Sequence, residues 1–367
     1  MAAFLGSSEN SFSEVSIGWR AIWRGLWKRP TTSFALLILI ILYASAVTAD
    51  FIAPHNPTTQ NLQATFHPPT RLFLKNGKIH VMGYRLIDPT AAIYKEDPDL
   101  AQPIPFLVSD STYKFLGLIP MKLKLWQAPE GARFYLLGSD STGRCVFSRL
   151  LYGARISLSV GIIGISITMI LGCLIGCIAG YFGGWMDTLA MRLTEILMAV
   201  PGLYLLLALR SAFAEHFSSD QMYLLIVGIL SFIGWSGTAR VVRGLALSIK
   251  ERPYVLASRA LGQSTAKILT RHLLRNMTSY LIVAGMMSIP GYILGEAALS
   301  FLGVGIQEPS ASWGLMLSQA QEMKVFMLNF WWLLSPGILI ILTVLCFNIL
   351  GEGLRDLVDP KFRFFNK

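Results

Sequence analysis

Charged residues are scarce in this chain of 367 residues. Only 14% of the residues are Asp, Glu, Lys or Arg, 53% are hydrophobic, and the mean hydropathy is +0.54. A water-soluble domain carries roughly a quarter charged residues and buries its apolar surface in one core. The composition therefore excludes an ordinary soluble protein and indicates a membrane protein.

Cysteine and histidine are also few, with four and five copies. Cys173 and Cys177 are spaced to share one helical face, where small packing residues are expected, and Cys145 stands alone outside the apolar runs. We therefore expect no extracytoplasmic disulfide. No two histidines have the close spacing of a helical zinc pair, and we expect neither a metal nor a cofactor.

Motifs for catalysis and nucleotide binding are missing as well. The sequence has no GxxxxGK[ST] phosphate loop, so the chain should not bind ATP through one. The apolar runs hold no nucleophile and base at matching depth, which an intramembrane hydrolase needs. A non-catalytic protein is expected. If ATP drives it, another subunit must hydrolyse the ATP.

Six runs without charge are present instead. They cover residues 30–49, 156–186, 196–209, 221–239, 276–295 and 325–351. A bilayer core of about 30 Å needs roughly 20 residues of helix, and the third run falls short of that length. Backbone groups in lipid must be paired within the segment, so these runs are expected to be helices. The runs lack the alternation of apolar and polar residues that is typical of a β-barrel. The predicted fold class is an all-α integral membrane protein with six transmembrane helices.

The first run allows a second interpretation. An Ala44-Ser45-Ala46 triplet follows its apolar stretch, as in a cleaved signal peptide. The charge-free sequence nevertheless reaches the length of a full span. This length favours a retained transmembrane helix.

Basic residues are concentrated in three segments between or beyond these runs. The segment 1–29 contains Arg20, Arg24, Lys28 and Arg29, the tail 354–367 contains Arg355, Lys361, Arg363 and Lys367, and the loop 240–275 has eight basic residues against one acid, Glu251. Lys and Arg in short loops resist translocation, so with six spans both termini are predicted to be cytoplasmic in a bacterial inner membrane. This topology and anionic lipid explain most of the net charge of +10, and no nucleic-acid partner is expected.

A long polar insert separates the first two runs. It carries twelve basic residues on the opposite side, but the charge rule is weak for loops longer than about 60 residues. We expect it to form a small β-containing extracytoplasmic lobe. The predicted organisation is a cytoplasmic tail (1–29), a first helix (30–53), the insert (54–155, with its lobe in 54–140), a five-helix core (156–353) that contains a cytoplasmic loop (240–278), and a tail (354–367).

The stretch LASRALGQSTAKILTRHLL in that loop is amphipathic and too charged to span a membrane. After Gly262 its basic and apolar residues fall on opposite stripes, with Lys267, Arg271 and Arg275 on one and Ala266, Leu269 and Leu273 on the other. Two short helices with Gly262 at the turn are predicted. Such a segment either lies on lipid or docks its apolar stripe into a groove on a partner protein, and the residues alone leave both open.

The segment 254–276 resembles the EAA loop of ABC-importer permeases, which has the pattern EAAxxxG followed by an Ile-Leu-Pro element. Ala257 and Gly262 match in register, whereas Leu256 stands in place of the glutamate and Ser258 in place of the second alanine. The Leu-Leu-Arg sequence at 273–275 occupies the Ile-Leu-Pro position.

Four further blocks resemble one branch of that family. LGSDSTGRCVFSRLLYGARISLSVG is similar to the G[TS]DxxGRDxxSRLxxGARxSL signature of the C-type permeases of peptide importers. WRAIWRGLWKRPTTSFALLILIILY with FIAPHNP, EAALSFLGVGIQEPSASWGLML, and SPGILIILTVLCFNILGEGLRDLVDPK resemble its first span, fifth-span exit and last span. The resemblance covers the chain apart from the long insert, and it points to oligopeptide and dipeptide ABC-importer permeases of the OppC/DppC type.

The resemblance implies a type I importer fold and several partners. These are a second permease of the OppB/DppB type, two ABC ATPases, an extracytoplasmic peptide-binding protein, the peptide cargo and membrane lipid. It also implies that the loop acts as a coupling helix that carries ATPase closure into rocking of the two permeases. The residues assigned to coupling are Tyr254, Ala257, Ser258, Ala260, Leu261, Gly262, Lys267, Arg271, Leu273 and Leu274.

Three residues near or within spans are candidates for the translocation path. Glu296 either faces the cavity, where it would attract a peptide amino terminus, or sits in interfacial water. Pro201 and Pro290 permit kinks that line a path, although irregular packing is the commoner cause. Arg192 and Glu195, one turn apart, are expected to form a local ion pair.

Two other transport classes compete with a peptide importer. A permease for nickel or another small solute would share the same scaffold and coupling motifs. A secondary transporter would need an inverted repeat and ion-coupling groups at the midplane, and neither is evident in the sequence.

Overall fold

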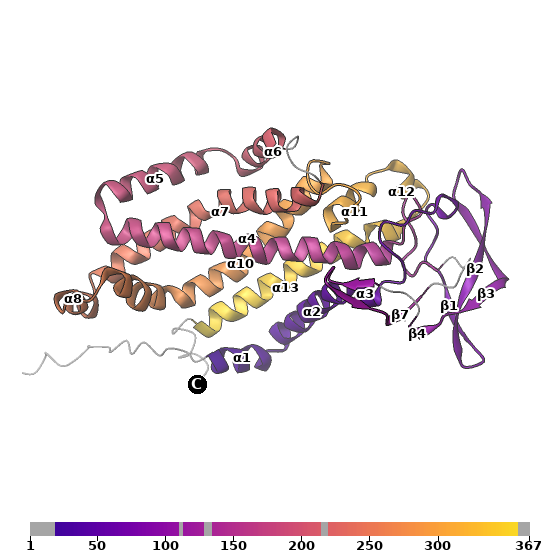
Figure 1. The fold of residues 1–367 in the computed structure, drawn as a ribbon, viewed down its shortest axis with the longest axis horizontal. Coiled ribbons are helices and arrows are strands. Elements are labelled where there is room, and N and C mark those ends of the chain that lie inside the picture. Colours follow the sequence, from indigo (N-terminus) through magenta and orange to yellow (C-terminus); the bar gives the residue numbers. More distant parts are fainter. Residues whose placement is uncertain (1–18, 110–112, 128–133, 214–218, 359–367) are drawn as a thin grey trace, which may run out of the picture.

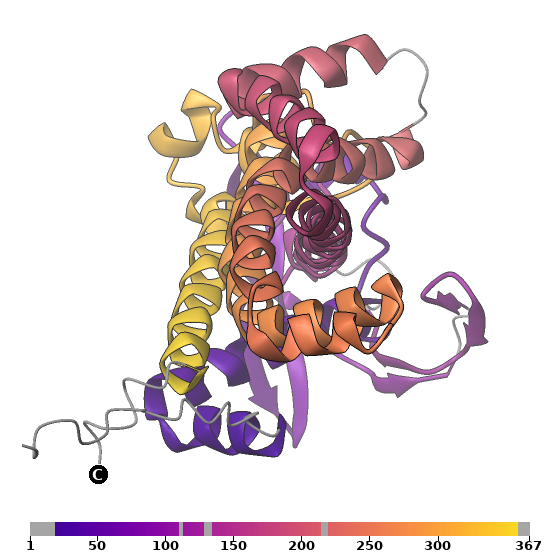
Figure 2. The same ribbon diagram turned by 90° about the vertical axis from the view of Figure 1, so that its left-hand side faces the viewer.

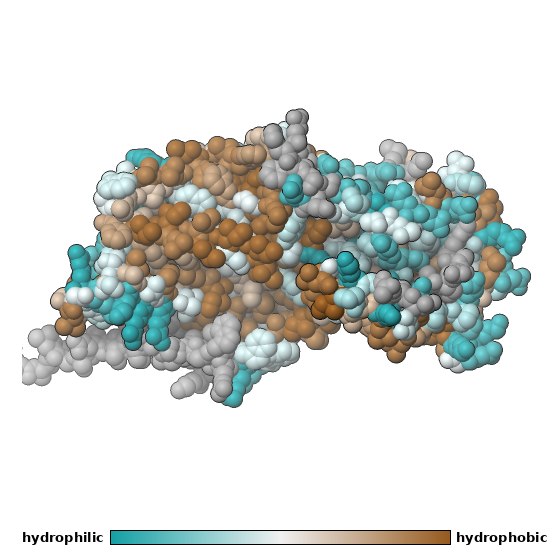
Figure 3. Space-filling model, viewed as in Figure 1, coloured by the Kyte–Doolittle hydropathy of each residue, from teal (hydrophilic) through white to brown (hydrophobic). Residues whose placement is uncertain are grey.

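The computed structural model describes residues 19–109, 113–127, 134–213 and 219–358. Long helices lie side by side in a bundle, and a small β lobe covers one end of it (Figure 1). Five helical stretches are long and apolar enough to cross a membrane: Pro30–Val47, Val146–Phe182, Gln221–Lys250, Thr265–Phe301 and Trp331–Val358. Apolar side chains cover the bundle, whereas polar ones gather on the lobe and on the loop at the opposite end (Figure 3).

The helices follow the predicted order. They are α1 (Trp19–Lys28), α2 (Pro30–Val47), α3 (Ala49–Ile52), α4 (Val146–Phe182), α5 (Gly184–Ala199), α6 (Gly202–Phe213), α7 (Ser219–Lys250), α8 (Pro253–Ala260), α9 (Thr265–Lys267), the π-helix η3 (Ile268–Leu274), α10 (Arg275–Phe301), α11 (Trp313–Gln319), α12 (Met323–Met327), the short 3-10 helices η1 (Leu62–Ala64) and η4 (Trp331–Leu334), and α13 (Ser335–Val358).

The third predicted run is not one helix, so the prediction of a continuous span over 196–209 is wrong. Val200 is extended, with φ −90° and ψ 127°, and it separates α5 from α6. The cause is Pro201, because its ring disfavours helical backbone at the preceding residue. A sixth passage of the membrane, by α5 and α6 together, stays a prediction.

The packing of α4 against α7 supports that passage. Ser231 donates to the carbonyl of Gly164 (3.1 Å), and Lys250 near the end of α7 donates to the carbonyl of Gly180 near the end of α4 (2.9 Å). The two helices are therefore parallel, so the intervening chain has to return along the bundle. Arg243 of α7 binds Asp187 of α5 through two hydrogen bonds of 2.7 and 2.6 Å, which hold the returning segment beside α7.

Glycines on α4 allow this close parallel contact. A Cβ at Gly176 would lie 2.5 Å from the carbonyl oxygen of Ala239, and one at Gly172 would lie 2.6 Å from Thr238. Helices in lipid associate through such close packing, because lipid tails are as apolar as the side chains themselves.

We expect Gly176→Ala to destabilise the bundle by about 1–3 kcal/mol, since α7 must move away from the added methyl group. The melting temperature of the purified protein measures the effect. Gly237→Ala is the matched control on α7, because a Cβ there meets no atom of the described residues within 4 Å. Equal melting temperatures for the two variants would contradict the packing argument.

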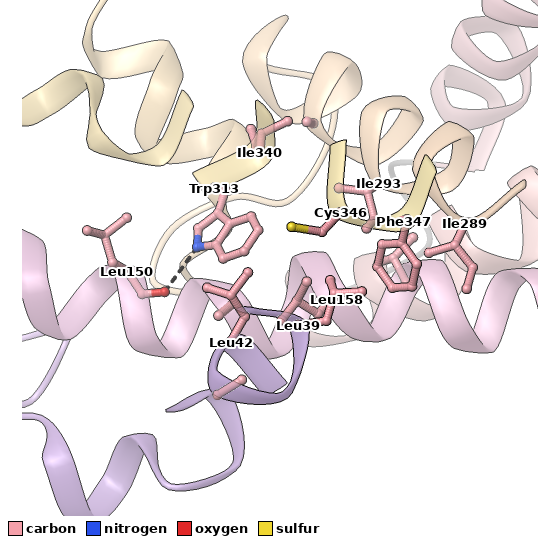
Figure 4. Packing of buried hydrophobic residues seen from close by; sticks show 14 of the residues in the cluster. Leu39, Leu42, Leu150, Leu158, Ile289, Ile293, Trp313, Ile340, Cys346 and Phe347 are labelled. Carbon is pink, nitrogen blue, oxygen red and sulfur yellow. Dashed lines mark hydrogen bonds between the residues drawn. The ribbon is translucent and has the colours of Figure 1, made fainter. Parts of the chain in front are cut away.

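The core lies where α2, α4, α10, α11 and α13 meet. Leu39 and Leu42 of α2 face Leu158 of α4, with Phe347 of α13 beside them (Figure 4). Trp313 of α11 is completely buried, and its indole nitrogen donates to the carbonyl of Leu150 (3.0 Å). Trp313 is thus a packing residue at the end of the bundle that carries the lobe.

The insert contains the strands that the sequence predicts for it. The strands β1 (Leu72–Lys75), β2 (Lys78–Asp88) and β3 (Ile93–Pro103) form an antiparallel sheet in that order. Two hairpin-like pairs follow, β4 (Phe106–Val108) with β7 (Lys124–Trp126) and β5 (Tyr113–Phe115) with β6 (Ile119–Met121). The all-α description therefore applies to the membrane helices and not to the lobe.

All four cysteines are free in the structure. Cys145, at the junction of the lobe and α4, is buried, and burial raises the pKa of its thiol. A protonated, inaccessible thiol is inert, so Cys145 serves as a small packing residue.

Candidate functional site

The loop between α7 and α10 folds back on itself at Gly262. The helix α8 ends at Ala260, Leu261 caps it, Gly262 has φ +74°, and the chain becomes helical again at Thr265. A Cβ at Gly262 would meet no atom of the described residues within 4 Å. Glycine is therefore required here for its backbone angle and not for lack of space.

The apolar side of the loop packs against the chain's own helices. Val255, Ile268 and Leu273 are at most 2% exposed and join a cluster with residues of α4, α7 and α10: Cys177, Val242, Ala246, Ile249 and Met277. Leu269 packs on the same cluster. The hypothesis that the apolar stripe docks into a partner's groove is therefore wrong for Leu273, because this side chain is already buried.

Polar side chains join the two halves of the loop. The His272 ring lies with Nε2 2.8 Å from Oε1 of Gln263 and 3.3 Å from Oγ of Ser258. Asn276 donates through Nδ2 to the Tyr254 hydroxyl (2.7 Å) and to the His272 carbonyl (2.7 Å). These bonds fasten α8 to η3, so the loop is one stiff body.

The exposed residues of this body include both apolar and basic side chains. Leu261 is 88% exposed and Leu256, which replaces the family's glutamate, is 45% exposed. We call this face the coupling surface; its exposed members are Tyr254, Leu256, Ala257, Ala260, Leu261, Lys267 and Arg271. Of the other residues assigned to coupling, Ser258 and Leu274 are half-buried and Leu273 is buried, so they support this surface from within.

A cavity of about 400 Å³ lies behind α8. Its walls come from the ends of α4 and α7 and from the loop: Tyr181, Phe182, Lys250, Glu251, Val255, Leu256, Arg259, Gln263, Thr265 and Ile268. Val255 is the one residue of α8 that is buried. The packing of η3 and the hydrogen bonds of His272 and Asn276 therefore hold the coupling surface in place more than packing beneath α8 does.

The loop continues directly into a long helix. From Thr265 to Phe301 the backbone is helical without interruption, through α9, η3 and α10. At 1.5 Å per residue this rod is about 55 Å long and spans the bundle. One continuous helical stretch therefore connects the loop to the end of the bundle that bears the lobe.

Glu296 lies near that far end and is completely buried. Its carboxylate accepts hydrogen bonds from the hydroxyls of Ser157 (2.9 Å) and Ser300 (2.8 Å), which come from α4 and α10. Ser157 in turn accepts from the Trp313 backbone nitrogen (3.1 Å). A carboxylate enclosed in this way joins three helices and does not face open space in the described part of the chain.

The other candidate path residues differ in their surroundings. Pro290 is buried inside α10, and Pro201 is exposed at the break between α5 and α6. The expected local pair of Arg192 and Glu195 is confirmed, with 2.6 Å between Nη1 and Oε2, and both side chains are exposed.

The signature LGSDSTGRCVFSRLL folds into an ion-pair cluster that the sequence did not assign. Arg144 contacts Asp140 (2.7 Å) and Glu308 (2.5 Å), and Arg149 donates to both carboxylate oxygens of Glu308 (2.9 and 3.2 Å). Asp140, Arg144 and Arg149 are nearly or fully buried, whereas Glu308 is 41% exposed. The cluster ties the start of α4 to the loop that follows α10. The closely spaced opposite charges Asp140, Arg144 and Arg149 in the signature were a signal for part of this cluster. No local pattern could add Glu308, because it lies 159 residues beyond Arg149.

Long apolar helices with glycine contacts, an exposed amphipathic loop at one end and a polar lobe at the other define a multi-pass membrane protein. The profile of the family described as "Binding-protein-dependent transport system inner membrane component" matches residues 172–364, and that of the "N-terminal TM domain of oligopeptide transport permease C" matches residues 19–69. The chain belongs to the family of inner-membrane components of binding-protein-dependent transport systems.

Several curated proteins are similar over most of their length. The dipeptide transport system permease protein DppC of Bacillus subtilis is 32% identical over 93% of this chain and 85% of its own. The oligopeptide transport system permease protein OppC of Haemophilus influenzae is 38% identical over 71% of this chain and 78% of its own. The glutathione transport system permease protein GsiD of Pectobacterium atrosepticum is 38% identical over 65% and 76%. These relatives are permease subunits, which agrees with a non-catalytic role.

Proposed function

We propose that this chain is one of two permease subunits that form the membrane path of an ATP-driven importer of oligopeptides or dipeptides. The similar proteins DppC and OppC are named as dipeptide and oligopeptide permeases, and this favours peptide over the nickel alternative. The observation that carries the mechanism is the stiff loop with an outward coupling surface that continues into α10. Both termini are proposed to be cytoplasmic, on the side of that surface.

In this proposal two partner ATPases hydrolyse ATP, and one of them binds the coupling surface. The exposed Leu261 and Leu256 enter an apolar groove of an ATPase, while Lys267 and Arg271 meet acidic residues at its rim. The polar bonds of His272 and Asn276 keep the loop from bending, so ATPase closure moves α10 as a rod. An effector shifts a two-state equilibrium only through such differential contacts.

At the other end of α10 the same motion reaches the Glu296 contacts and the loop that contains Glu308. We propose that the second permease, of the OppB/DppB type, faces this chain across the path and that a peptide-binding protein delivers cargo to the end with the lobe. Alternating access then follows from rocking of the two permeases against each other.

The direct test is uptake by a strain that lacks this subunit and depends on a peptide for an essential amino acid. We expect growth on the peptide to return when the chain is expressed with its partner subunits. Uptake of radioactive nickel in the same strains is the comparison. Restored nickel uptake without restored peptide uptake would overturn the substrate assignment and leave the transporter class intact.

A further inference from the structure

The hairpin of β5 and β6 separates apolar from basic side chains. Tyr113 pairs with Met121 and Phe115 with Ile119, while Lys114 lies opposite Pro120. Side chains alternate between the faces of a strand, so the four apolar residues share one face and Lys114 lies on the other. Lys122, the next residue along, also falls on the basic face. We call residues 113–122 the apolar hairpin.

The tip of the apolar hairpin is unusually exposed for its composition. Leu118 is 82% exposed, Ile119 59% and Leu116 46%. The turn is tight, because Leu116 and Gly117 both have positive φ and Leu118 donates its N–H to the Phe115 carbonyl (3.0 Å). A contiguous apolar tip of this kind marks a contact with lipid or with a partner.

The position of the tip is fixed relative to the first membrane helix. The Leu116 N–H donates to Oδ2 of Asp50 (2.9 Å), which lies just beyond the end of α2 at Val47. Asp50 is held in turn by Arg155 (2.7 Å) and by the Tyr152 hydroxyl (2.7 Å) of α4. The leucines at the tip are therefore held at the level where two candidate spans, α2 and α4, meet the lobe.

Part of the insert extends away from the bundle. In Figure 2, which looks along the length of the bundle, purple strands of the insert extend sideways beyond the helices. The strand β5 contacts α3, which Figure 1 labels at the boundary between the helical bundle and the lobe. The structure thus places an apolar tip beside the end of the candidate span α2.

We propose that the apolar hairpin inserts into the interface of the outer leaflet beside α2. Leu116, Leu118 and Ile119 enter the boundary between headgroups and acyl chains, while Lys114 and Lys122 reach anionic headgroups. Lysine suits this place, because its stem can lie along apolar surface while its ammonium stays in water. A lipid surface is favoured over a protein partner by the direct link between the tip and the end of a membrane helix.

The insertion gives the lobe a second attachment to the membrane. The segment 113–126 is joined to the bundle through the contact of Leu116 with Asp50 and through the Trp126 indole, which donates to the Ile52 carbonyl. An additional anchor to the side of the bundle limits tilting of the lobe. It thereby fixes the orientation of the surface that the lobe presents above the membrane.

The test uses the assembled importer in nanodiscs of phosphatidylcholine and phosphatidylglycerol. An environment-sensitive fluorophore is attached at Leu118→Cys, in a background in which the half-buried Cys173 is replaced by alanine. Lipids that carry a nitroxide just below the headgroup should quench this fluorophore several-fold more than one at Lys75→Cys. Lys75 is the matched control, because it is exposed on β1 of the same lobe.

Three results would decide the matter. Strong quenching at position 118 and little at position 75 would support insertion. The double substitution Lys114→Glu and Lys122→Glu should then reduce the quenching more in nanodiscs that contain phosphatidylglycerol than in nanodiscs of phosphatidylcholine alone. Equal weak quenching at both positions, with equal access of aqueous iodide, would overturn the proposal. Shielding at position 118 that requires the second permease or the binding protein, and not lipid, would assign the tip to a protein contact and overturn it too.

Discussion

Replacement of Leu261 with aspartate should lower peptide uptake and co-purification of the ATPases by at least tenfold. Leu261 is the most exposed large apolar side chain of the coupling surface, and a central apolar anchor in an interface is typically worth about 2 kcal/mol or more. A carboxylate there would stay desolvated and unpaired in the ATPase groove. The measurement is the amount of ATPase retained on the affinity-purified chain in mild detergent, together with uptake in cells.

The control for Leu261→Asp is Leu74→Asp. Leu74 is 73% exposed on β1, so the substitution makes the same chemical change on an exposed leucine of the lobe. Unaltered ATPase retention and membrane insertion are expected for it. If Leu261→Asp kept its ATPases and lost uptake, the coupling surface would have to lie elsewhere on the loop. Charge reversal at Lys267 and Arg271 would then show whether the basic edge alone holds the partner.

The second large effect concerns stability. Arg149→Ala should reduce the free energy of unfolding by about 3–5 kcal/mol, because it leaves Asp140 and Glu308 with one arginine instead of two in a buried cluster. Thermal unfolding followed by intrinsic fluorescence measures the change, and a large loss of folded protein in the membrane is the expected cellular result.

An exposed ion pair provides the comparison for Arg149→Ala. Arg192→Ala breaks the pair with Glu195, in which both side chains are exposed, and such pairs contribute about 0–1 kcal/mol. Its melting temperature should stay close to that of the unmodified chain. Equal losses in the two variants would mean that the buried cluster is not a major contributor to stability.

Much of the membrane architecture was predictable, because lipid imposes a strict length and composition on each span. Five of the six predicted runs coincide with helices long enough to cross a bilayer. The exception is the run 196–209. A count of apolar residues does not show that Pro201 forces the backbone of Val200 into an extended conformation and so divides the run into two helices. The parallel arrangement of α4 and α7 depends on contacts between Gly176 and Ala239, which lie too far apart in the sequence for a local pattern to reveal.

The loop was predicted less completely than the spans. Its amphipathic pattern and its glycine turn were visible, but the stripe holding Leu273 was assigned to a partner although it faces the chain's own α4 and α7. A helical wheel shows that a face is apolar without showing what covers it. The contacts of His272 with Gln263 and Ser258 arise only when the two short helices fold together, so no spacing rule identified them.

The π-helical stretch η3 determines how the two ends of the rod are oriented relative to each other. It covers Ile268–Leu274, carries Arg271 of the coupling surface, and continues directly into α10. One residue more or less in a helix turns everything beyond it by about 100° and shifts it by about 1.5 Å. A single insertion in α10, between η3 and Glu296, would therefore rotate Glu296 away from the hydroxyl of Ser157 on α4. We therefore expect related permeases to keep the number of residues between the start of α10 and the buried carboxylate.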